Sequence, residues 1–298
     1  MAVDIPFQKH LEFEYGKVDQ LSPLVRRVIA NNPSSFTFYG TGTYIVGRDK
    51  VAVIDPGPAD PDHIDAILNA TVGESITHIL VTHTHLDHSP GCELLQQYTD
   101  AKTFAFDKHG LGRTPDESDF GADWLFEPDI KLSDGEALES DSWSLSGVYS
   151  PGHAANHLSF YLAQERALFC GDAVMGWSTT IVSPPDGNMV DYMQTLERLL
   201  LREDNIYYPT HGAPIVAPKN YVQALYDHRL EREQQVIDCV VSGVQSVNAM
   251  LPVVYSELDP AMYPAAARSL LATIECLVAK KLLHQRVEDG EIFYLESL

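Results

Sequence analysis

Residues 76–88 have the sequence ITHILVTHTHLDH. The first six form an apolar, β-branched run that predicts a buried strand. The next seven place three histidines and one aspartate in a short loop at the end of that strand. Imidazole and carboxylate groups are ligands of borderline divalent metals, and each would need its own polar partner if it were buried without one. The stretch therefore predicts a metal site at a strand end.

The spacing within this loop suggests two metals rather than one. Alternate side chains of an extended segment share a side, so His83 and His85 point the same way. Asp87 and His88 come after the chain turns and can bind a second metal. A two-metal site needs further ligands, including one that bridges. Three candidates follow later apolar runs, each beside a glycine that permits close backbone approach: His153, Asp172 and His211.

The totals limit the class of protein. A chain of 298 residues suggests one large or two ordinary domains, and 45% hydrophobic residues are enough for a full core. The formal net charge of −22 repels polyanions at long range. Generic binding to nucleic acid or to an anionic membrane is therefore not favoured.

The cysteines and the N-terminus bear on the compartment. The four cysteines form no C-x-x-C pair, which suggests neither a disulfide framework nor a thiolate metal site: Cys92, Cys170, Cys239 and Cys276. The first residues lack the basic and apolar regions of a signal peptide, and no uninterrupted apolar stretch could span a membrane. We therefore expect a cytoplasmic protein that does not enter the membrane.

Short apolar runs alternate with helical patterns up to about residue 210. Strands are predicted at residues 36–39, 44–46, 51–54, 76–81, 102–106, 143–149, 157–163, 167–170 and 206–208. Helices are predicted at residues 60–70, 92–98 and 191–201. Residues 107–128 are rich in glycine and acidic side chains and predict a mobile flap, whose acidic residues include Asp116, Glu117, Asp119 and Asp123.

The pattern changes beyond Pro218. Helices are predicted at residues 221–241, 244–255 and 261–282. Two short strands at 284–287 and 292–295 then flank a glycine-containing turn. Three helices followed by a hairpin is the order of a winged helix. We therefore expect a catalytic domain at residues 1–217 and a winged-helix-like domain at residues 218–298.

At this point the ligand series resembles that of the metallo-β-lactamase superfamily. The resemblance implies an α/β fold (α+β) built as a four-layer αββα sandwich, with two metals at one edge of the sheets. It implies that one metal is held by His83, His85 and His153. It further implies that the other is held by Asp87, His88 and His211, and that Asp172 bridges the two.

Two more residues receive roles outside the ligand set. Asp55, in the stretch VIDPG at residues 53–57, resembles the early Asp-x-Gly element of the superfamily. The resemblance implies that Asp55 orients the histidine loop. His157 has two open roles, because it can contact the substrate or bind solvent or backbone. The other histidines, His109 among them, have no partner in the pattern and are expected to be surface or structural residues.

The same resemblance implies a reaction. A hydroxide shared by two divalent metals is a strong nucleophile at neutral pH. Asp87 can carry a proton to the leaving group. Histidine at position 85, where flavodiiron oxidoreductases have glutamate, favours a zinc-type hydrolase, although His and Asp ligands also take Mn, Fe or Co. The lack of a cysteine ligand argues against the antibiotic-hydrolysing branch with a thiolate site.

Within the superfamily, the chain resembles the β-lactamase-like protein 2 group. The stretches that carry this resemblance are GHAANH at 152–157, SPPDG at 183–187, YMQTL at 192–196 and HRxxRE at 228–233. Two departures are visible. Asn156 stands where the group often has aspartate, and Thr210 stands where the final ligand usually follows a glycine. They concern substrate choice rather than metal binding.

Three functions remain open from the sequence. The first is hydrolysis of a small ester, thioester or lactone. The second is cleavage of single-stranded RNA. The third is a nucleic-acid-binding regulator that uses its winged helix. From Tyr221 onward there are six Lys and Arg against eleven Asp and Glu, which disfavours a DNA-reading domain. The tail is expected to pack over the active site or to form a homodimer surface.

Aromatic residues offer one possible feature of a small-substrate site. Trp124, Trp177 and Tyr192 could line an apolar wall for an acyl group, or they could belong to the core.

Overall fold

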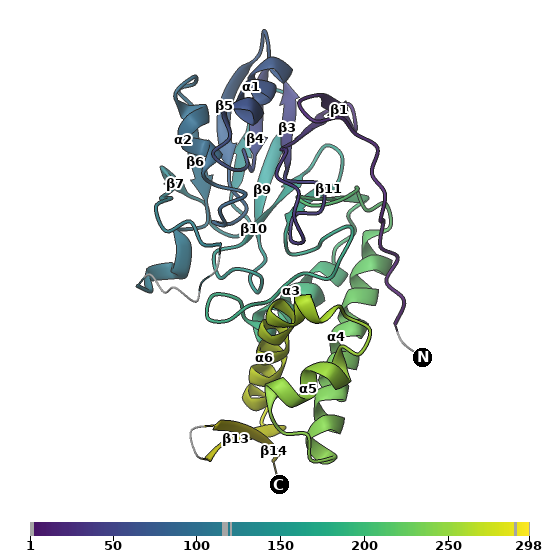
Figure 1. The fold of residues 1–298 in the computed structure, drawn as a ribbon. Coiled ribbons are helices and arrows are strands. Elements are labelled where there is room, and N and C mark those ends of the chain that lie inside the picture. The colour runs from purple at the N-terminus through teal and green to yellow at the C-terminus, as the bar shows by residue number, and fades with distance from the viewer. Residues whose placement is uncertain (1–2, 115–118, 120, 289–290, 298) are drawn as a thin grey trace.

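The computed structural model of the chain describes residues 3–114, 119, 121–288 and 291–297. Two sheets pack face to face, and helices cover their outer faces (Figure 1). The larger sheet has the strands β1 Val18–Gln20, β2 Val25–Ile29, β3 Gly42–Arg48, β4 Lys50–Ile54, β5 Ser75–Leu80, β6 Lys102–Ala105 and β7 Ile130–Lys131, in that order. The smaller sheet has the order β12 Ile206–Pro209, β11 Ala167–Gly171, β10 Leu158–Leu162, β9 Ser144–Tyr149 and β8 Ala137–Glu139.

The helices of this part are α1 Pro61–Ala70, α2 Gly91–Gln96, the short 3₁₀ helix η1 His109–Gly112 and α3 Met189–Leu200. Side-chain clusters define the layers between them. Tyr44 of the larger sheet and Phe160 of the smaller one share the central core. Ile67 of α1 and Leu95 of α2 cover the outer face of the larger sheet. On the other side, α3 packs against the smaller sheet. The predicted αββα sandwich is confirmed.

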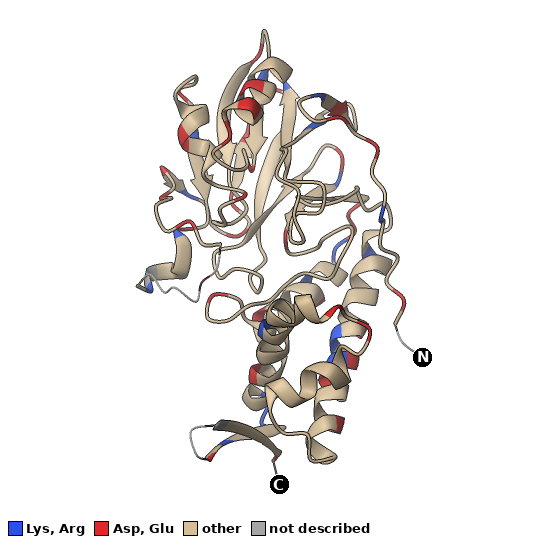
Figure 2. Ribbon diagram, in the orientation of Figure 1, with Lys and Arg blue, Asp and Glu red and all other residues tan. Residues whose placement is uncertain are grey.

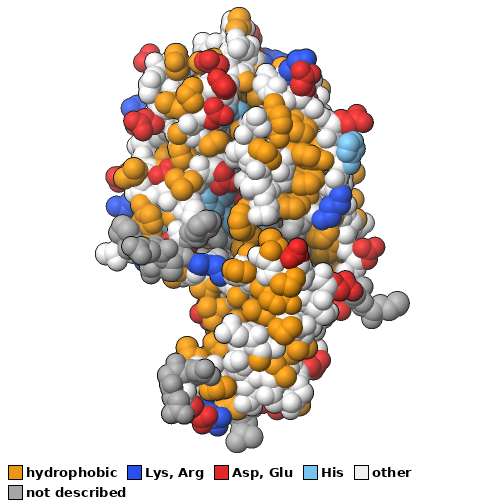
Figure 3. All heavy atoms as spheres, viewed as in Figure 1, with side chains coloured by type: hydrophobic (Ala, Val, Ile, Leu, Met, Phe, Trp, Pro, Cys, Tyr) orange, Lys and Arg blue, Asp and Glu red, His pale blue; other side chains and the backbone are white. Residues whose placement is uncertain are grey.

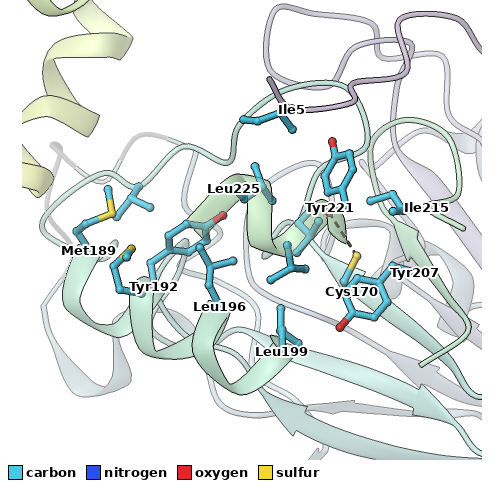
Figure 4. Close-up of a cluster of buried hydrophobic side chains, with 14 of the residues drawn as sticks. Ile5, Cys170, Met189, Tyr192, Leu196, Leu199, Tyr207, Ile215, Tyr221 and Leu225 are labelled. Carbon is cyan, nitrogen blue, oxygen red and sulfur yellow. Dashed lines mark hydrogen bonds between the residues drawn. The ribbon is translucent and has the colours of Figure 1, made fainter. Parts of the chain in front are cut away.

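The outer core behind the smaller sheet also contains a helix from the C-terminal part, α4 Pro218–Val241. Figure 4 shows Tyr192 and Leu196 of α3 in the same buried cluster as Tyr221 and Leu225 of α4. The cluster continues to Cys170 at the end of β11. The C-terminal part is therefore packed against the sandwich through a shared apolar core.

The strand predicted at residues 36–39 is wrong. The hydroxyl of Ser34 accepts hydrogen bonds from the backbone N–H groups of Phe36 and Thr37, both at 3.1 Å. These bonds close a turn, and Phe38 has a left-handed backbone with φ of 59°. The segment forms a loop beside the start of β3 instead of a strand.

Strand β2 is present although no strand was predicted there. Its sequence, VRRVI, is interrupted by two arginines, yet both are buried. Arg26 lies 2.7 Å from Glu74, and Arg27 lies 3.1 Å from Asp19. Because these pairs neutralise the buried charge, the strand lies inside the sheet despite its polar pattern.

The C-terminal part has the predicted order of three helices and a hairpin. It contains α4, α5 Val247–Val254, the 3₁₀ turn η2 Pro260–Met262, α6 Tyr263–Ala279, and the paired strands β13 Leu283–Glu288 and β14 Glu291–Glu296. Asp289 and Gly290 of the predicted turn lie outside the described residues. Val236, Leu270 and Leu277 are among the side chains of its own small core. That it is a winged-helix domain stays a prediction. Within the described ranges, no helix has the length and apolar character needed to cross a membrane.

The central core predicts a stability difference between two leucines. Leu162 on β10 is fully buried between the sheets, whereas Leu201 is 84% exposed. We expect Leu162→Ala to lower the free energy of unfolding by about 2–5 kcal/mol, because it removes buried methyl groups and leaves a cavity. Leu201→Ala should change it by less than about 0.5 kcal/mol. Urea unfolding of both variants measures this; equal losses would contradict the layer assignment.

Candidate metal centre

The predicted ligands lie at one edge of the sandwich because each follows or precedes a strand end there. The loop with the four clustered ligands leaves β5 and leads into α2. Asp172 directly follows β11, and His211 lies two residues after the parallel strand β12, so both are at the carboxyl ends of neighbouring strands. His153 lies in the loop between β9 and β10. Segments distant in sequence thus meet at a single edge.

Three imidazoles converge on one point. The Nε2 atoms of His83 and His153 lie 2.9 and 3.0 Å from Nδ1 of His85. The other ring nitrogen of His153 donates to the carbonyl oxygen of Ile181 at 2.6 Å, so Nε2 is the nitrogen that faces the other two rings. Burial holds the pKa of His83 and of His85 well below the ordinary value, so both are neutral. The three nitrogens that face one another form a group that could hold a cation.

A second group forms around Asp87. Its Oδ2 lies 3.2 Å from Nε2 of His211 and 3.5 Å from Nε2 of His88. The other ring nitrogen of His211 donates to the carbonyl of Gly40 at 3.1 Å, which turns Nε2 toward Asp87. Burial would raise the pKa of Asp87, but the neighbouring His88 and His211 hold it well below its usual range. The carboxylate is therefore ionised.

Asp172 lies between the two groups. Its Oδ2 is 3.5 Å from Nε2 of His211 and 3.7 Å from Nε2 of both His88 and His153. Burial favours the neutral acid, yet His211 and His88 keep the pKa of this carboxyl below its ordinary value. The residue contacts one histidine of the first group and two of the second, which is the position a bridging ligand needs.

The donor atoms form groups of the kind that hold metal ions. Among the described residues, the groups able to hold an ion are His83, His85 and His153; His83, His88 and Asp172; and Asp87, His88 and His211. Nε2 of His88 and Oδ1 of Asp172 are buried without a hydrogen-bond partner. Buried polar atoms without partners are rare, and coordination to a cation would satisfy both. All seven predicted ligands are brought together; their binding of metal stays a prediction.

Asp55 is fully buried beside this site and accepts four hydrogen bonds. Its carboxylate accepts from the backbone N–H and the hydroxyl of Thr82, both at 2.7 Å. It also accepts from Nδ1 of His88 at 2.9 Å and from the hydroxyl of Thr210 at 3.1 Å. The bond to Nδ1 turns the other nitrogen of His88 toward the ligand groups. An orienting role would need contacts of this kind, and the role itself stays a prediction.

His157 lies behind the ligands, with its ring fully buried. Its Nε2 accepts the backbone N–H of Asp172 at 3.1 Å, and its Nδ1 donates to the hydroxyl of Ser150 at 2.8 Å. Burial lowers the pKa of His157 to about 3, so the ring is neutral. Of the two roles left open by the sequence, the structure supports the backbone-bonded one.

His109 contacts the ligand loop, which the sequence did not indicate. It is buried, and its Nδ1 lies 3.0 Å from the hydroxyl of Thr84, the residue between two predicted ligands. Asn156 donates to the same hydroxyl at 2.8 Å. Both contacts join residues far apart in the chain, so residue spacing in the sequence does not predict them. Asn156, which stands where the group often has aspartate, thus supports the ligand loop through Thr84.

The predicted flap is attached to the ligand loop where the structure describes it. The backbone N–H of Asp123 donates to the carbonyl of Thr84 at 2.9 Å, and its side chain accepts from Ser89 at 2.6 Å. Asp119 lies 3.1 Å from Arg113. Asp116 and Glu117 lie outside the described residues. Asp119 and Asp123 therefore both make contacts with other side chains of the protein.

The three aromatic residues considered for a substrate wall have different surroundings. Tyr192 is fully buried and donates to the carbonyl of Ala173 at 3.1 Å, so it belongs to the core. Trp124 packs edge-on against His109, with ring centroids 4.5 Å apart. Trp177 stacks on Phe38 at 4.7 Å and is half-buried.

Comparison with known proteins agrees with this fold. A family model described as "Metallo-beta-lactamase superfamily" matches residues 37–211. The chain therefore belongs to the metallo-β-lactamase superfamily, and it is a hydrolase of that class. It is 30% identical to the "Beta-lactamase-like protein 2 homolog" of Caenorhabditis elegans over 296 residues, which cover 97% of this chain and 92% of the relative. The predicted resemblance to that group is confirmed.

Two further relatives extend the comparison. An "Atrochrysone carboxyl ACP thioesterase" of Aspergillus novofumigatus is 32% identical over 237 residues, covering 78% of this chain and 67% of the relative. The crystal structure of a β-lactamase domain protein from Burkholderia ambifaria superposes with a TM-score of 0.81 at 21% identity. That superposition covers 99% of this chain and 97% of the other, so the C-terminal part shares its fold as well.

The bonds to Asp55 predict two unequal effects on stability. Asp55→Asn puts an amide where four donors meet and leaves buried His88 without its carboxylate partner. We expect it to lower the free energy of unfolding of the metal-free protein by roughly 3–5 kcal/mol. Thr210→Val removes one hydroxyl bond at nearly constant volume and should cost about 1 kcal/mol. Urea unfolding in the presence of a chelator compares them; a harmless Asp55→Asn would show that the bonds do not hold the loop.

Proposed function

We propose that this protein is a dinuclear metal-dependent hydrolase that cleaves a small thioester, ester or lactone. The observation that carries the proposal is the position of Asp172 between two three-residue groups of metal-ligand type. We assign His83, His85 and His153 to one cation and Asp87, His88 and His211 to the other, with Asp172 shared. Zinc suits this set of imidazoles and carboxylates, and Mn, Fe or Co could also bind it.

The bound cations would supply a hydroxide nucleophile at neutral pH and polarise the carbonyl that it attacks. The side chains of the protein orient this chemistry. Asp55 and the carbonyls of Gly40 and Ile181 fix the protons of three ligand histidines on the nitrogens that face away from the site. The side chain of Asp87 is 26% exposed, against 5% for Asp172. We therefore assign to Asp87 the transfer of a proton between solvent and the leaving group.

Cysteine nucleophiles do not compete with this mechanism. All four cysteines are buried. Cys170 lies two residues before Asp172. Burial raises the pKa of its thiol well above that of a free thiol. A thiol at that pKa is protonated at neutral pH and is a poor nucleophile.

The substrate class rests on charge and on one group of relatives. The protein is strongly acidic, and Lys and Arg are interspersed with Asp and Glu along the C-terminal helices instead of forming a basic row (Figure 2). Figure 3 shows exposed hydrophobic side chains on the C-terminal helices and on the adjoining face of the sandwich. These features favour a small, partly apolar substrate over a polyanion. The relatives named as acyl carrier protein thioesterases favour a thioester.

We also propose the division into a catalytic unit at residues 1–217 and a winged-helix-like unit at 218–298. The second unit has a small core of its own, which supports the division. Because the shared core includes Tyr221 and Leu225, we infer that its role is to complete the catalytic unit rather than to read DNA.

The proposal predicts metal-dependent turnover. A panel of p-nitrophenyl esters, acyl thioesters, lactones and labelled single-stranded RNA is tested with added Zn or Mn. We expect hydrolysis of a thioester or ester that disappears on chelation and returns with metal. Asp172→Asn and His153→Ala should lower kcat/KM at least roughly 100-fold, because each removes a ligand.

His284→Ala serves as the control, because that histidine is exposed on β13 far along the chain. It should leave kcat/KM unchanged. Turnover that survives complete removal of metal would refute the metal mechanism. Cleavage of RNA alone would instead refute the substrate class and support the ribonuclease alternative.

A further inference from the structure

The segment HRxxRE at residues 228–233 distinguishes helix α4 in the sequence, and its two arginines have different targets. Arg229 is 5% exposed and donates a hydrogen bond from its guanidinium to the carbonyl oxygen of Thr180. The same guanidinium lies over the ring of Tyr192, 5.2 Å from its centroid. Arg229 thus reaches from the C-terminal part into a loop of the sandwich.

That loop supports two of the proposed metal ligands. The hydroxyl of Thr180 donates to the carbonyl oxygen of Asp172 at 2.9 Å. The carbonyl of the next residue, Ile181, accepts the Nδ1 proton of His153 at 2.6 Å. Arg229 therefore holds the peptide unit between Thr180 and Ile181. Thr180 contacts Asp172, and Ile181 contacts His153.

The surroundings of Arg229 are costly for a charged group. Within the part of the chain that the structure describes, its guanidinium has no ion pair with a carboxylate, and its Nε atom is buried without a hydrogen-bond partner. A buried cation that lacks an opposite charge weakens a fold unless its other contacts compensate. Any compensation at Arg229 therefore comes from its contacts with Thr180 and Tyr192.

A second contact from the C-terminal part reaches the same loop. Arg268 of α6 donates to the hydroxyl of Ser183 and, at 3.1 Å, to the carbonyl of Pro184. Helices α4 and α6 thus both hold the loop that begins after Asp172. Of the two arginines, Arg229 binds nearer to the ligands in sequence.

We propose that Arg229 is a positioning residue of the metal centre. By fixing the Thr180–Ile181 peptide, it keeps the proton of His153 on Nδ1 and presents Nε2 to the metal, and it holds Asp172 in its shared position. Helix α4 is thereby a structural part of the proposed active site. This inference rests on the proposed function only in that the seven ligands bind metal; it does not depend on the substrate.

The chain contains a matched control three residues away on the same helix. Arg232 lies over the ring of Tyr255 at 4.8 Å and donates to the carbonyl of Val254. It therefore makes the same two kinds of contact as Arg229, and it also donates to the side chain of Gln235 at 2.7 Å. Its targets belong to the C-terminal part alone, so its loss should disturb packing without moving the metal ligands.

The experiment compares Arg229→Met, Arg229→Lys and Arg232→Met in the full-length protein. Zinc affinity is measured by competition with a chromophoric chelator, and the electronic absorption of the Co(II)-loaded protein reports ligand geometry. Thermal unfolding of the metal-free variants measures the loss of packing. We expect Arg229→Met to bind zinc at least about tenfold more weakly and to change the Co(II) spectrum, as loss of an outer hydrogen-bond partner does. Arg229→Lys should recover part of the affinity, because an ammonium can donate to the same carbonyl.

Arg232→Met should bind zinc with an affinity within about twofold of that of the original protein. We expect this even if its melting temperature falls as far as that of Arg229→Met. If Arg229→Met and Arg232→Met have the same affinity and the same Co(II) spectrum as the original protein, the positioning role is wrong. If Arg229→Met does not fold, the affinity and spectrum of Arg229→Lys decide by the same criterion. Failure of the original protein to bind zinc or cobalt would instead refute the proposed metal centre itself.

Discussion

Asp55 is buried at the end of β4, where its carboxylate accepts hydrogen bonds from segments that belong to both sheets. Thr82 follows β5 in the larger sheet, and Thr210 follows β12 in the smaller one. A buried carboxyl group needs several hydrogen-bond donors, and here the donors come from these strand ends. Because the same carboxylate also accepts from His88, one side chain both joins the two sheets and orients a proposed ligand. The other proposed ligands are positioned by the strands whose ends the Asp55 hydrogen bonds hold together.

The sequence predicts most of this edge because each ligand follows a strand whose apolar run is easy to recognise. Strand β5 and the loop of residues 82–88 are the clearest case. The prediction fails where polar side chains are buried in pairs, as at Arg26 and Arg27 of β2, since an apolar pattern cannot include them. It also fails at residues 36–39, where the Ser34 hydroxyl closes a turn and overrides the strand propensity of two phenylalanines.

The support of the site is less visible in the sequence than its ligands. A ligand set has a fixed order and spacing, whereas Thr84, His109 and Asn156 meet only because three separate loops fold onto one another. Nothing in the local sequence of His109 distinguishes it from an exposed histidine. The same is true of Arg229: the stretch around it was recognisable by resemblance, but its contact with Thr180 depends on how α4 packs against the sandwich.

If the proposed metals are bound, the electrostatics of the edge would let an acidic protein stabilise a developing negative charge. Asp87 and Asp172 are the two carboxylates among the proposed ligands, and two divalent cations would exceed their charge. The excess would remain local, because the five histidine ligands are neutral when they coordinate. Buried charges are screened far less than those at the surface, so this local field outweighs the net charge of −22 for a substrate already in the site. At longer range the acidic surface still repels polyanions. These two fields therefore favour the proposed small carbonyl substrate over a polyanion.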